Sequence, residues 1–588
     1  MDDGFAPSSI FHPPSSPSLN PEPRTRAALE LPRKFRYTFH TTRRIMHDIE
    51  LILGLMVVVA AFAWLAARLR VPYPILLVIA GLVIGCIPGL PRVTLRPDLV
   101  FLLFMPPILY YAGLMTSWRD FRNNVGPISM LSVGLVLFTT CAVAAVAHGI
   151  IPGMTWPAAF VLGAIISPPD AAAATAILQR MRIPKRLVTV LEGESLVNDA
   201  MAIVAYRFAV AGVVYGTFSL NEAALQVLIV GLGGVAFGYL VGRAVTWVRP
   251  HLHDSGVETM LSLLTPFIAY LPAEWLHISG VLSAVTAGLY VGRRLPQTTT
   301  GQQRIRLYGV WETLIFIING IVFILIGLQL PAILARLKGY HLPKLLAYAA
   351  LISVVTVVAR FAWVYVTVYV PRLLFPRLRR RIPLPPRAEV FAIAWIALRG
   401  IVSLATALAL PLTLADQSTP FPARDLILFI TFGVILVTLV AQGLTLPAVI
   451  RRLRLKSDDV EEHEETLARL EAAHAALARL EVLGITNEDT ADLIARVREP
   501  YDLRVQYLSA VTGRLRLISD DNDTPTDAPA PPRTTDEVLR HAITAEREML
   551  INLRDAGTIG DDVLRRILQD LDLDEAKLAA AVREPVRA

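Results

Sequence analysis

The chain has 588 residues, of which 54% are hydrophobic and 18% charged, and its formal net charge is +7. This composition favours a membrane protein over an array of soluble domains. The arginines lie in short loops between apolar runs instead of on one soluble face, which argues against nucleic acid as a partner. The cysteines, Cys86 and Cys141, lie in apolar segments and indicate neither a disulfide framework nor a metal cluster.

The N-terminal stretch 1–45 is rich in Pro, Ser and Arg and contains no hydrophobic region of a signal peptide. It is typical of a disordered extension. The first apolar segment is expected to begin on the outer side of the membrane, where an arginine-rich flank is unexpected. We therefore predict that translation starts at Met46.

Thirteen apolar segments follow, and most are long enough to cross a bilayer. They cover about residues 49–68, 72–90, 98–116, 125–150, 156–179, 187–213, 221–247, 256–272, 275–292, 309–330, 343–370, 388–412 and 424–450. Arginine and lysine concentrate in alternate loops, so this side and the C-terminus are expected to be cytoplasmic. The sequence predicts an all-α, multi-pass protein of a bacterial inner membrane, with residues 46–455 as its transmembrane domain.

The fifth segment is interrupted by the sequence ISPPD, which contains Pro168, Pro169 and Asp170. Two consecutive prolines remove two backbone donors and clash with the preceding turn, so we expect the helix to break here. Unpaired backbone groups at membrane depth are tolerated only where they line a cavity or bind an ion. The break is therefore a candidate ion site.

The sixth segment contains LEGESLVNDAM, which places polar residues within an otherwise mostly apolar run: Glu192, Glu194, Ser195, Asn198 and Asp199. Ser195 and Asp199 are four residues apart and share a helix face with Glu192, while Glu194 and Asn198 form the neighbouring pair. A carboxylate at the bilayer centre costs roughly 2.5–3.5 kcal/mol, so it needs a partner, water or a cation. The cluster predicts binding of an alkali cation or a proton.

Further ionisable residues follow. Glu312 and Arg360, in segments ten and eleven, are expected to be buried and can pair with each other or with the cluster in segment six. Segment twelve is interrupted at ALRGIVS, where the permanent charge of Arg399 needs an anion. We expect Glu194 to be that anion, with Glu192 as the second choice. For Glu194, Glu312, Arg360 and Arg399, the pattern is equally consistent with a purely structural role, in which ion pairs brace the helices. Glu192 can also simply face water.

Four motifs occur in the order ISPPDAAAATAIL, EGESLVNDAMAIV, WETLIFIINGIVFILIGL and LRGIVSLATALALP. Together they resemble the monovalent cation/proton antiporter family, which includes bacterial sodium/proton antiporters and animal sodium/proton exchangers. The resemblance covers roughly residues 49–450. It implies about thirteen transmembrane helices in inverted repeats, with segments five and twelve as two crossed discontinuous helices. It also implies a separate dimerisation domain, and hence a homodimer.

By matching motif positions, the resemblance makes Asp199 the residue that carries the cation or the proton, with Asn198 beside it. It implies that Ser195 lends its hydroxyl to the ion and that Asp170 lies at the helix crossing. Asp199, Asp170 and Ser195 are thus the expected metal-ion ligands. Relatives usually have Ser or Thr where this chain has Pro169, whose carbonyl can still point at the ion. An Asn-Asp pair goes with electroneutral exchange in this family.

A second departure from the family pattern is Tyr111, which replaces an acidic residue that many relatives carry in the third segment. The cavity entrance is therefore expected to be less negative. The chain is predicted to be a transporter, not an enzyme, without cofactors, that exchanges Na⁺ or K⁺ for H⁺ by competition for Asp199 and alternating access. A K⁺/H⁺ antiporter of the same fold is one alternative, and a cation channel or ion sensor is another.

The C-terminal part has apolar residues at helical spacing with charges between them, over 456–518 and 536–588. The stretch 519–535 is rich in Asp, Pro and Thr and is predicted to be a linker. No phosphate loop or nucleophile constellation is present in this part. We expect a solvated cytoplasmic tail that aids dimerisation or folding.

Overall fold

The computed structural model describes residues 50, 53–88, 100–178, 181, 183–216, 220–252, 254–337, 340–374, 384–414, 418–455, 459–486, 491–512 and 534–583. The predicted extension 1–45 and start at Met46 lie outside these residues, as does nearly all of the predicted linker 519–535. The chain divides into two units, Met1–Leu55 and Met56–Ala588. The second unit holds the helices that carry the polar motifs.

The second unit is built from helices, and its described β-structure is a single isolated bridge between Thr413 and Pro420. Seven helical segments are long and apolar enough to cross a bilayer: Val125–Ile150, Lys185–Tyr215, Leu225–His251, Ser255–Trp275, Gly301–Arg336, Leu342–Leu374 and Arg424–Leu453. Shorter apolar helices cover Leu53–Leu69, Tyr73–Gly85, Val100–Met115 and Trp156–Ile166. The predicted all-α membrane class is confirmed, whereas the count of thirteen spans stays a prediction.

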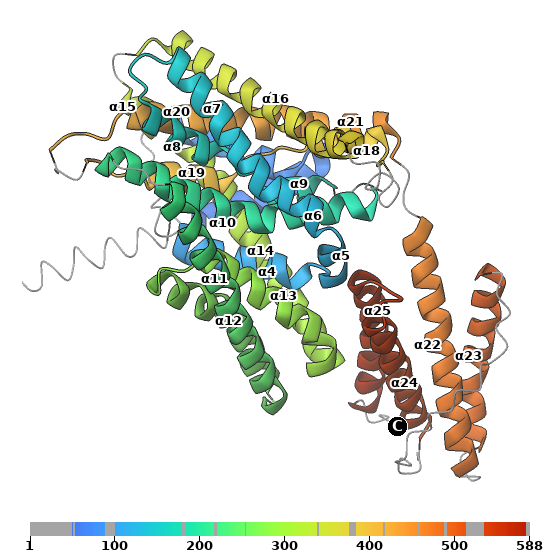
Figure 1. Cartoon of the computed structure of the whole chain (residues 1–588). Helices are drawn as coiled ribbons and strands as arrows, with labels where there is room; N and C mark the ends of the chain where they lie inside the picture. Colours follow the sequence, from blue (N-terminus) through green and yellow to red (C-terminus); the bar gives the residue numbers. More distant parts are fainter. Residues whose placement is uncertain are drawn as a thin grey trace, which may run out of the picture. The chain divides into compact units, whose positions relative to one another are not determined.

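The membrane helices pack in two groups, which we name the scaffold group and the core group. The scaffold group comprises α2 (Tyr73–Gly85), η1 (Val100–Phe104), α4 (Met105–Met115), α11 (Leu220–Val248), η3 (Arg249–His251), α12 (Ser255–Trp275), α13 (Gly280–Thr298) and α14 (Gly301–Leu328). The core group comprises α6 (Val125–Ser129), η2 (Met130–Leu135), α7 (Val136–Ile150), α8 (Trp156–Ile166), α9 (Ala171–Leu178), α10 (Lys185–Tyr215), α16 (Leu342–Leu374), α18 (Arg387–Trp395), α19 (Ile401–Leu408), α20 (Arg424–Val437), η4 (Thr438–Gln442) and α21 (Gly443–Leu453). Along the chain, each of two short helices connects a scaffold helix to a core helix. These are α5 (Trp118–Asn123), between α4 and α6, and α15 (Leu330–Arg336), between α14 and α16. Figure 1 shows α11, α12 and α13 side by side, and α7 beside α16, while α8 packs against α7.

Glycines allow the scaffold helices to pack at very short distance. A side chain at Gly113 of α4 would overlap the carbonyl of Val285, and one at Gly288 of α13 would overlap the carbonyl of Tyr110. Small residues let two helix backbones approach closely, which is a main source of helix association where lipid replaces water. Trp311 of α14 is fully buried in the adjoining apolar cluster. The scaffold is therefore closely packed around α4 and α13.

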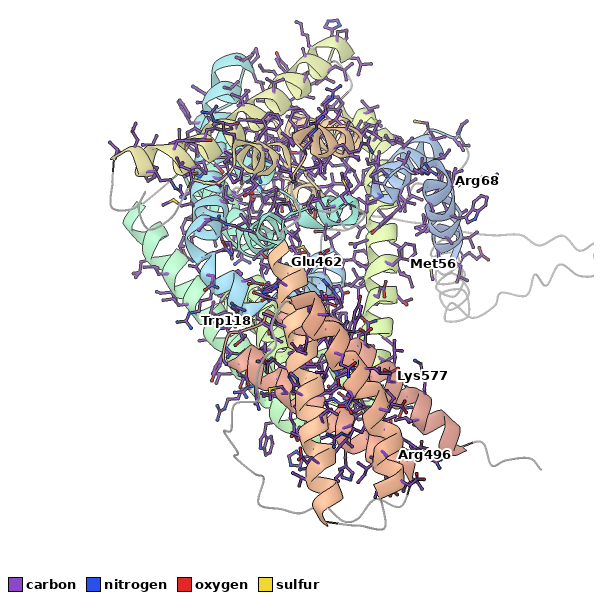
Figure 2. The ribbon with its side chains drawn as sticks, turned by 90° about the vertical axis from the view of Figure 1, so that its right-hand side faces the viewer. Met56, Arg68, Trp118, Glu462, Arg496 and Lys577 are labelled. Carbon is purple, nitrogen blue, oxygen red and sulfur yellow. The ribbon has the colours of Figure 1, made fainter. Side chains whose placement is uncertain are left out.

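The tail consists of four helices, α22 (Asp459–Thr486), α23 (Ala491–Thr512), α24 (Thr535–Asp555) and α25 (Asp561–Arg583). The two predicted helical regions do not stand apart, because α22 packs against α23, α24 and α25. One apolar cluster joins α22, α24 and α25, and another joins α22, α23 and α24. Figure 2 labels one exposed residue on each of α22, α23 and α25, namely Glu462, Arg496 and Lys577. The alternation of apolar and charged residues in the sequence thus builds one helical assembly.

A buried acid links two of these tail helices. Glu546 of α24 is 1% exposed, and its carboxylate accepts hydrogen bonds from the Tyr501 hydroxyl at 3.0 Å and from Arg504 Nη1 at 3.0 Å. Burial raises the pKa of Glu546, and the Arg504 charge opposes that rise. Arg504 therefore supplies the countercharge that lets this acid stay in the interior of the tail.

We expect Arg504→Ala to lower the free energy of unfolding of the tail by about 1–3 kcal/mol, because it leaves a buried carboxylate with one partner fewer. Hydrogen–deuterium exchange of α24 in the full chain measures this loss. The control is Arg496→Ala, which breaks an exposed pair with Asp492 whose side chains are 67% and 79% exposed. Such a pair contributes roughly 0–1 kcal/mol. Equal exchange in the two variants would contradict the prediction.

Candidate functional site

The fifth apolar segment is broken into two helices. Helix α8 ends at Ile166 and α9 begins at Ala171, and the residues between them are not helical. The break contains Pro168 and Pro169, which cannot donate backbone hydrogen bonds. Asp170 follows them, and its backbone N–H donates to the carbonyl of Leu398 at 2.7 Å. The break is therefore held by a residue far away in the sequence.

Leu398 belongs to a second break. Helix α18 ends at Trp395 and α19 begins at Ile401, so the twelfth apolar segment is interrupted over 396–400. A side chain at Gly400 would overlap the Asp170 carboxylate, which explains why glycine stands here. The two non-helical stretches thus lie against each other. The backbone of Asp170 bonds to that of Leu398, and the Asp170 side chain packs against the backbone of Gly400.

Arg399, in the second break, is buried and points at backbone carbonyls. Its Nε donates to the carbonyl of Ile166 at 2.7 Å, and its Nη1 donates to that of Ala397 at 2.5 Å. Ile166 is the last residue of α8, where carbonyls lack helical partners and carry partial negative charge. The backbone N–H of Arg399 donates to the Thr438 hydroxyl at 3.2 Å. The guanidinium therefore caps a broken helix end.

The predicted ion pair between Glu194 and Arg399 is wrong, and so is the second choice of Glu192 for that role. Glu194 instead accepts two hydrogen bonds from Arg360, at 2.5 Å and 2.8 Å, and both side chains are almost completely buried. Arg360 Nε also donates to the carbonyl of Ile393 at 3.1 Å. This bidentate pair braces α10 against α16 and α18. Arg399 donates to carbonyls instead of a carboxylate, and Glu194 acts on it through its charge without a direct bond.

The remaining polar residues of α10 meet the first break. The Asn198 side chain, which is buried, donates from Nδ2 to the carbonyl of Pro169 at 3.0 Å. Asp199 follows it and is 7% exposed, and the charge of Asp170 acts on its carboxylate. Ser195 is half-buried, one helical turn before Asp199 on the same face. The structure therefore brings together Asn198, Asp199 and the break at Asp170, as the motifs predict.

Two predicted buried acids lie elsewhere. Glu312 on α14 is exposed, so its predicted burial is wrong, and it pairs neither with Arg360 nor with Arg399. Glu192 is half-buried on α10, where charges of the tail residues Asp562 and Arg565 act on it. The sequence places Glu192 on the face of Asp199 correctly, but it contains no local signal of the tail residues beside it.

Two polar residues of the last membrane helix, Thr438 and Gln442, were not predicted from the sequence. They are four residues apart in η4, a π-helical turn, and both are buried. Thr438 holds the second break at Arg399. π-Helical turns are frequent at functional sites. The available signal was the spacing, since two polar side chains four residues apart in an apolar span repeat the spacing of Ser195 and Asp199.

Chemically, the two acids Asp170 and Asp199 and the Ser195 hydroxyl offer hard oxygen ligands of the kind that a monovalent cation binds. Within the described part of the chain, no group of three or more His, Cys, Asp or Glu side chains is arranged to hold a metal ion. Two carboxylates and a hydroxyl suit an ion that binds and leaves more than one that is permanently held.

Comparison with known proteins gives a consistent result. A family model described as "Sodium/hydrogen exchanger, transmembrane" matches residues 55–452. The chain is 36% identical to an uncharacterized Na(+)/H(+) exchanger of Mycobacterium tuberculosis (strain ATCC 25618 / H37Rv), over 91% of this chain and 98% of that protein. It is 32% identical to a sodium, potassium, lithium and rubidium/H(+) antiporter of Bacillus subtilis (strain 168), over 68% of this chain and 61% of that protein.

A solved structure shares the fold. The sodium proton antiporter MjNhaP1 from Methanocaldococcus jannaschii superposes with a TM-score of 0.55 at 19% sequence identity. The match covers 70% of this chain and 99% of that one.

We expect Arg360→Ala to destabilise the protein by about 3–5 kcal/mol, because it leaves Glu194 charged and buried without its partner. Thermal unfolding in detergent measures the effect. The double variant Glu194→Gln with Arg360→Ala removes the stranded charge and should recover a large part of the loss. A double variant no more stable than Arg360→Ala would show that the loss does not come from Glu194.

We expect Gly400→Ala to lower stability by roughly 1–3 kcal/mol, because the new methyl group overlaps the Asp170 carboxylate and must displace it. The matched control is Gly309→Ala on α14, where the added carbon meets nothing within 4 Å. Melting temperatures of the two variants under identical conditions test this. The prediction fails if Gly400→Ala melts at the temperature of the control.

Proposed function

The chain belongs to the sodium/hydrogen exchanger family, and from this membership we propose that it is a secondary antiporter that exchanges Na⁺ or K⁺ for H⁺ by competition for Asp199. The membership confirms the resemblance seen in the motifs. The chain is a multi-pass membrane transporter, not an enzyme. The single structural observation that supports Asp199 as the shared site is the bond from Asn198 to the carbonyl of Pro169, because Asp199 is the next residue and the bond brings α10 to the break at Asp170.

The mechanism follows from one carboxylate with two competing ligands. Asp199 is buried next to a second acid, so its negative charge is unfavourable unless a proton or a cation neutralises it. A proton and a cation cannot occupy the same carboxylate together. If the core changes orientation only when Asp199 is neutralised, each ion moving one way requires the other ion to move back.

Electroneutral exchange is part of the proposal. Asn198 stands where a second aspartate would add another negative charge, and its amide is engaged by Pro169. One carboxylate then carries one positive charge in each direction per cycle. Asp170, Ser195 and the Pro169 carbonyl are proposed to supply oxygen atoms to the cation.

Architecture and location complete the proposal. We propose thirteen spans in inverted repeats, with α8–α9 and α18–α19 as the crossed pair, because their two breaks hydrogen-bond to each other. A cytoplasmic C-terminus is proposed from the positive charges of the loops. A homodimer in a bacterial inner membrane is proposed from the family. Potassium as the physiological cation is the second candidate, because the Bacillus subtilis relative is named as an antiporter of sodium, potassium, lithium and rubidium.

We expect Asp199→Asn to reduce exchange to the level of protein-free vesicles, because an amide cannot take up and release a proton. Proteoliposomes loaded at one pH and diluted into Na⁺, K⁺ or Li⁺ at another measure the flux and rank the cations. Asp425→Asn is the matched control, since Asp425 lies at the start of α20 with a 43% exposed side chain.

Substantial cation-driven proton flux through Asp199→Asn would contradict the assignment. The flux of the unmodified protein should be saturable and unchanged by an imposed voltage. A current that follows the voltage would indicate a channel instead.

A further inference from the structure

A cavity lies between the tail and the scaffold group. Its volume is about 180 Å³, and it is lined by residues of α13, α14, α24 and α25, including Asp561, the first residue of α25. The polar lining includes Tyr308 and Glu312 of α14 and Arg565 of α25. Tyr111 of α4 is close enough for the charges of Glu312 and Arg565 to act on it. Tyr111 is the residue that the motifs place at the entrance to the ion path.

Two anchors hold α25 over this cavity. Asp572 receives two hydrogen bonds from Arg304 of α14, at 2.8 Å and 2.5 Å, and both side chains are buried. Asp562 lies 3.1 Å from the Nζ of Lys185, the first residue of α10, and Lys185 also pairs with Asp120 at 2.9 Å. One anchor therefore ties α25 to the scaffold group, and the other ties it to the helix that carries Asp199.

Arg565 lies between these anchors along α25. Its Nη2 donates to the carbonyl of Met115, the last residue of α4, at 2.9 Å. Its Nη1 lies 3.5 Å from Asp562, and Tyr308 lines the same cavity. The charge of Arg565 acts on Glu192. These contacts fix the guanidinium at the membrane end of the cavity instead of leaving it in solvent.

Glu192 does not line this cavity, but the charge of Arg565, which does, acts on it. Glu192 precedes Asp199 by seven residues, which is about two helical turns or roughly 10 Å along the same face of α10. Glu312 lines the cavity from the opposite, scaffold side. A cation that enters from the tail side would thus meet Glu312 in the cavity and then Glu192 on α10, with Arg565 between them and Asp562 as its countercharge.

We propose that this cavity is the cytoplasmic entrance of the cation path and that Arg565 of the tail sets how readily cations enter it. The proposal rests on the antiport function proposed above. A fixed positive charge lowers the local concentration of cations and weakens the attraction of nearby carboxylates. The tail is then a part of the transport path, because it supplies one wall of the entrance and its charge.

The test compares neighbouring arginines on one helix. Exchange is measured with the cytoplasmic face exposed, as a function of cation concentration, for Arg565→Gln, Arg565→Lys and Arg566→Gln. Arg566 is the control because its contacts are Glu461 and Glu465 of α22, inside the tail. We expect Arg565→Gln to lower the half-saturating cation concentration by about fivefold at unchanged maximal rate. Arg565→Lys should behave as the unmodified protein.

Two further measurements separate charge from structure. The effect of Arg565→Gln should shrink when choline chloride raises the ionic strength, because salt screens the charge. Glu312→Gln, at an exposed position that tolerates change, should shift the half-saturating concentration in the opposite direction. This second variant keeps the test valid if Arg565→Gln does not assemble.

Equal half-saturating concentrations for Arg565→Gln and Arg566→Gln, or an unchanged value in Glu312→Gln, would overturn the proposal. Such results would leave antiport itself intact, since the unmodified protein would still exchange ions and Asp199→Asn would not. Exchange that persists in Asp199→Asn would instead remove the function on which the proposal rests.

Discussion

The need to satisfy broken backbone within apolar surroundings governs the core of this protein. A helix interrupted at membrane depth leaves carbonyl and amide groups without partners, and each such group is costly where water is absent. Here the two breaks serve each other. Asp170 bonds to Leu398, Arg399 caps the end of α8, and Asn198 bonds to Pro169. The polar groups that stabilise the breaks are therefore the same groups that surround the proposed ion site.

The distribution of buried charge explains why Asp199 is suited to a mobile ion. Glu194 accepts hydrogen bonds from Nη1 and Nη2 of Arg360, and Arg399 donates to backbone carbonyls. In the described part of the chain, neither arginine pairs with Asp199. A permanent arginine partner would hold the carboxylate ionised and closed to other cations. Because these two arginines have other partners, Asp199 is open to the small cation or proton that we propose it binds.

The sequence predicts the breaks and the face of α10 well, because both follow from local chemistry. Pro168 and Pro169 remove two consecutive backbone donors from the middle of an apolar segment, and the spacing of Ser195 and Asp199 determines that they share a face. The partner of Arg399 could not be predicted in this way. Glu194 and Arg360 are 166 residues apart, and only the three-dimensional fold brings α10 and α16 close enough for that pair. The same holds for α25, whose amphipathic pattern predicts a helix but not the anchors at Lys185 and Arg304.

The polar links also bear on how the protein can move. Asn198, Glu194 and Arg399 tie α8, α10, α16 and α18 to one another through buried bonds, so these helices are expected to move as one body. Between α10 and α12 of the scaffold, the link is an ion pair of Arg207 and Glu274 at 2.8 Å, with the arginine half exposed. Such a pair contributes roughly 0–1 kcal/mol and opens easily. Buried bonds within the core and a more exposed ion pair at this part of its boundary favour movement of the core helices as one unit, which is the motion that the proposed alternating access requires.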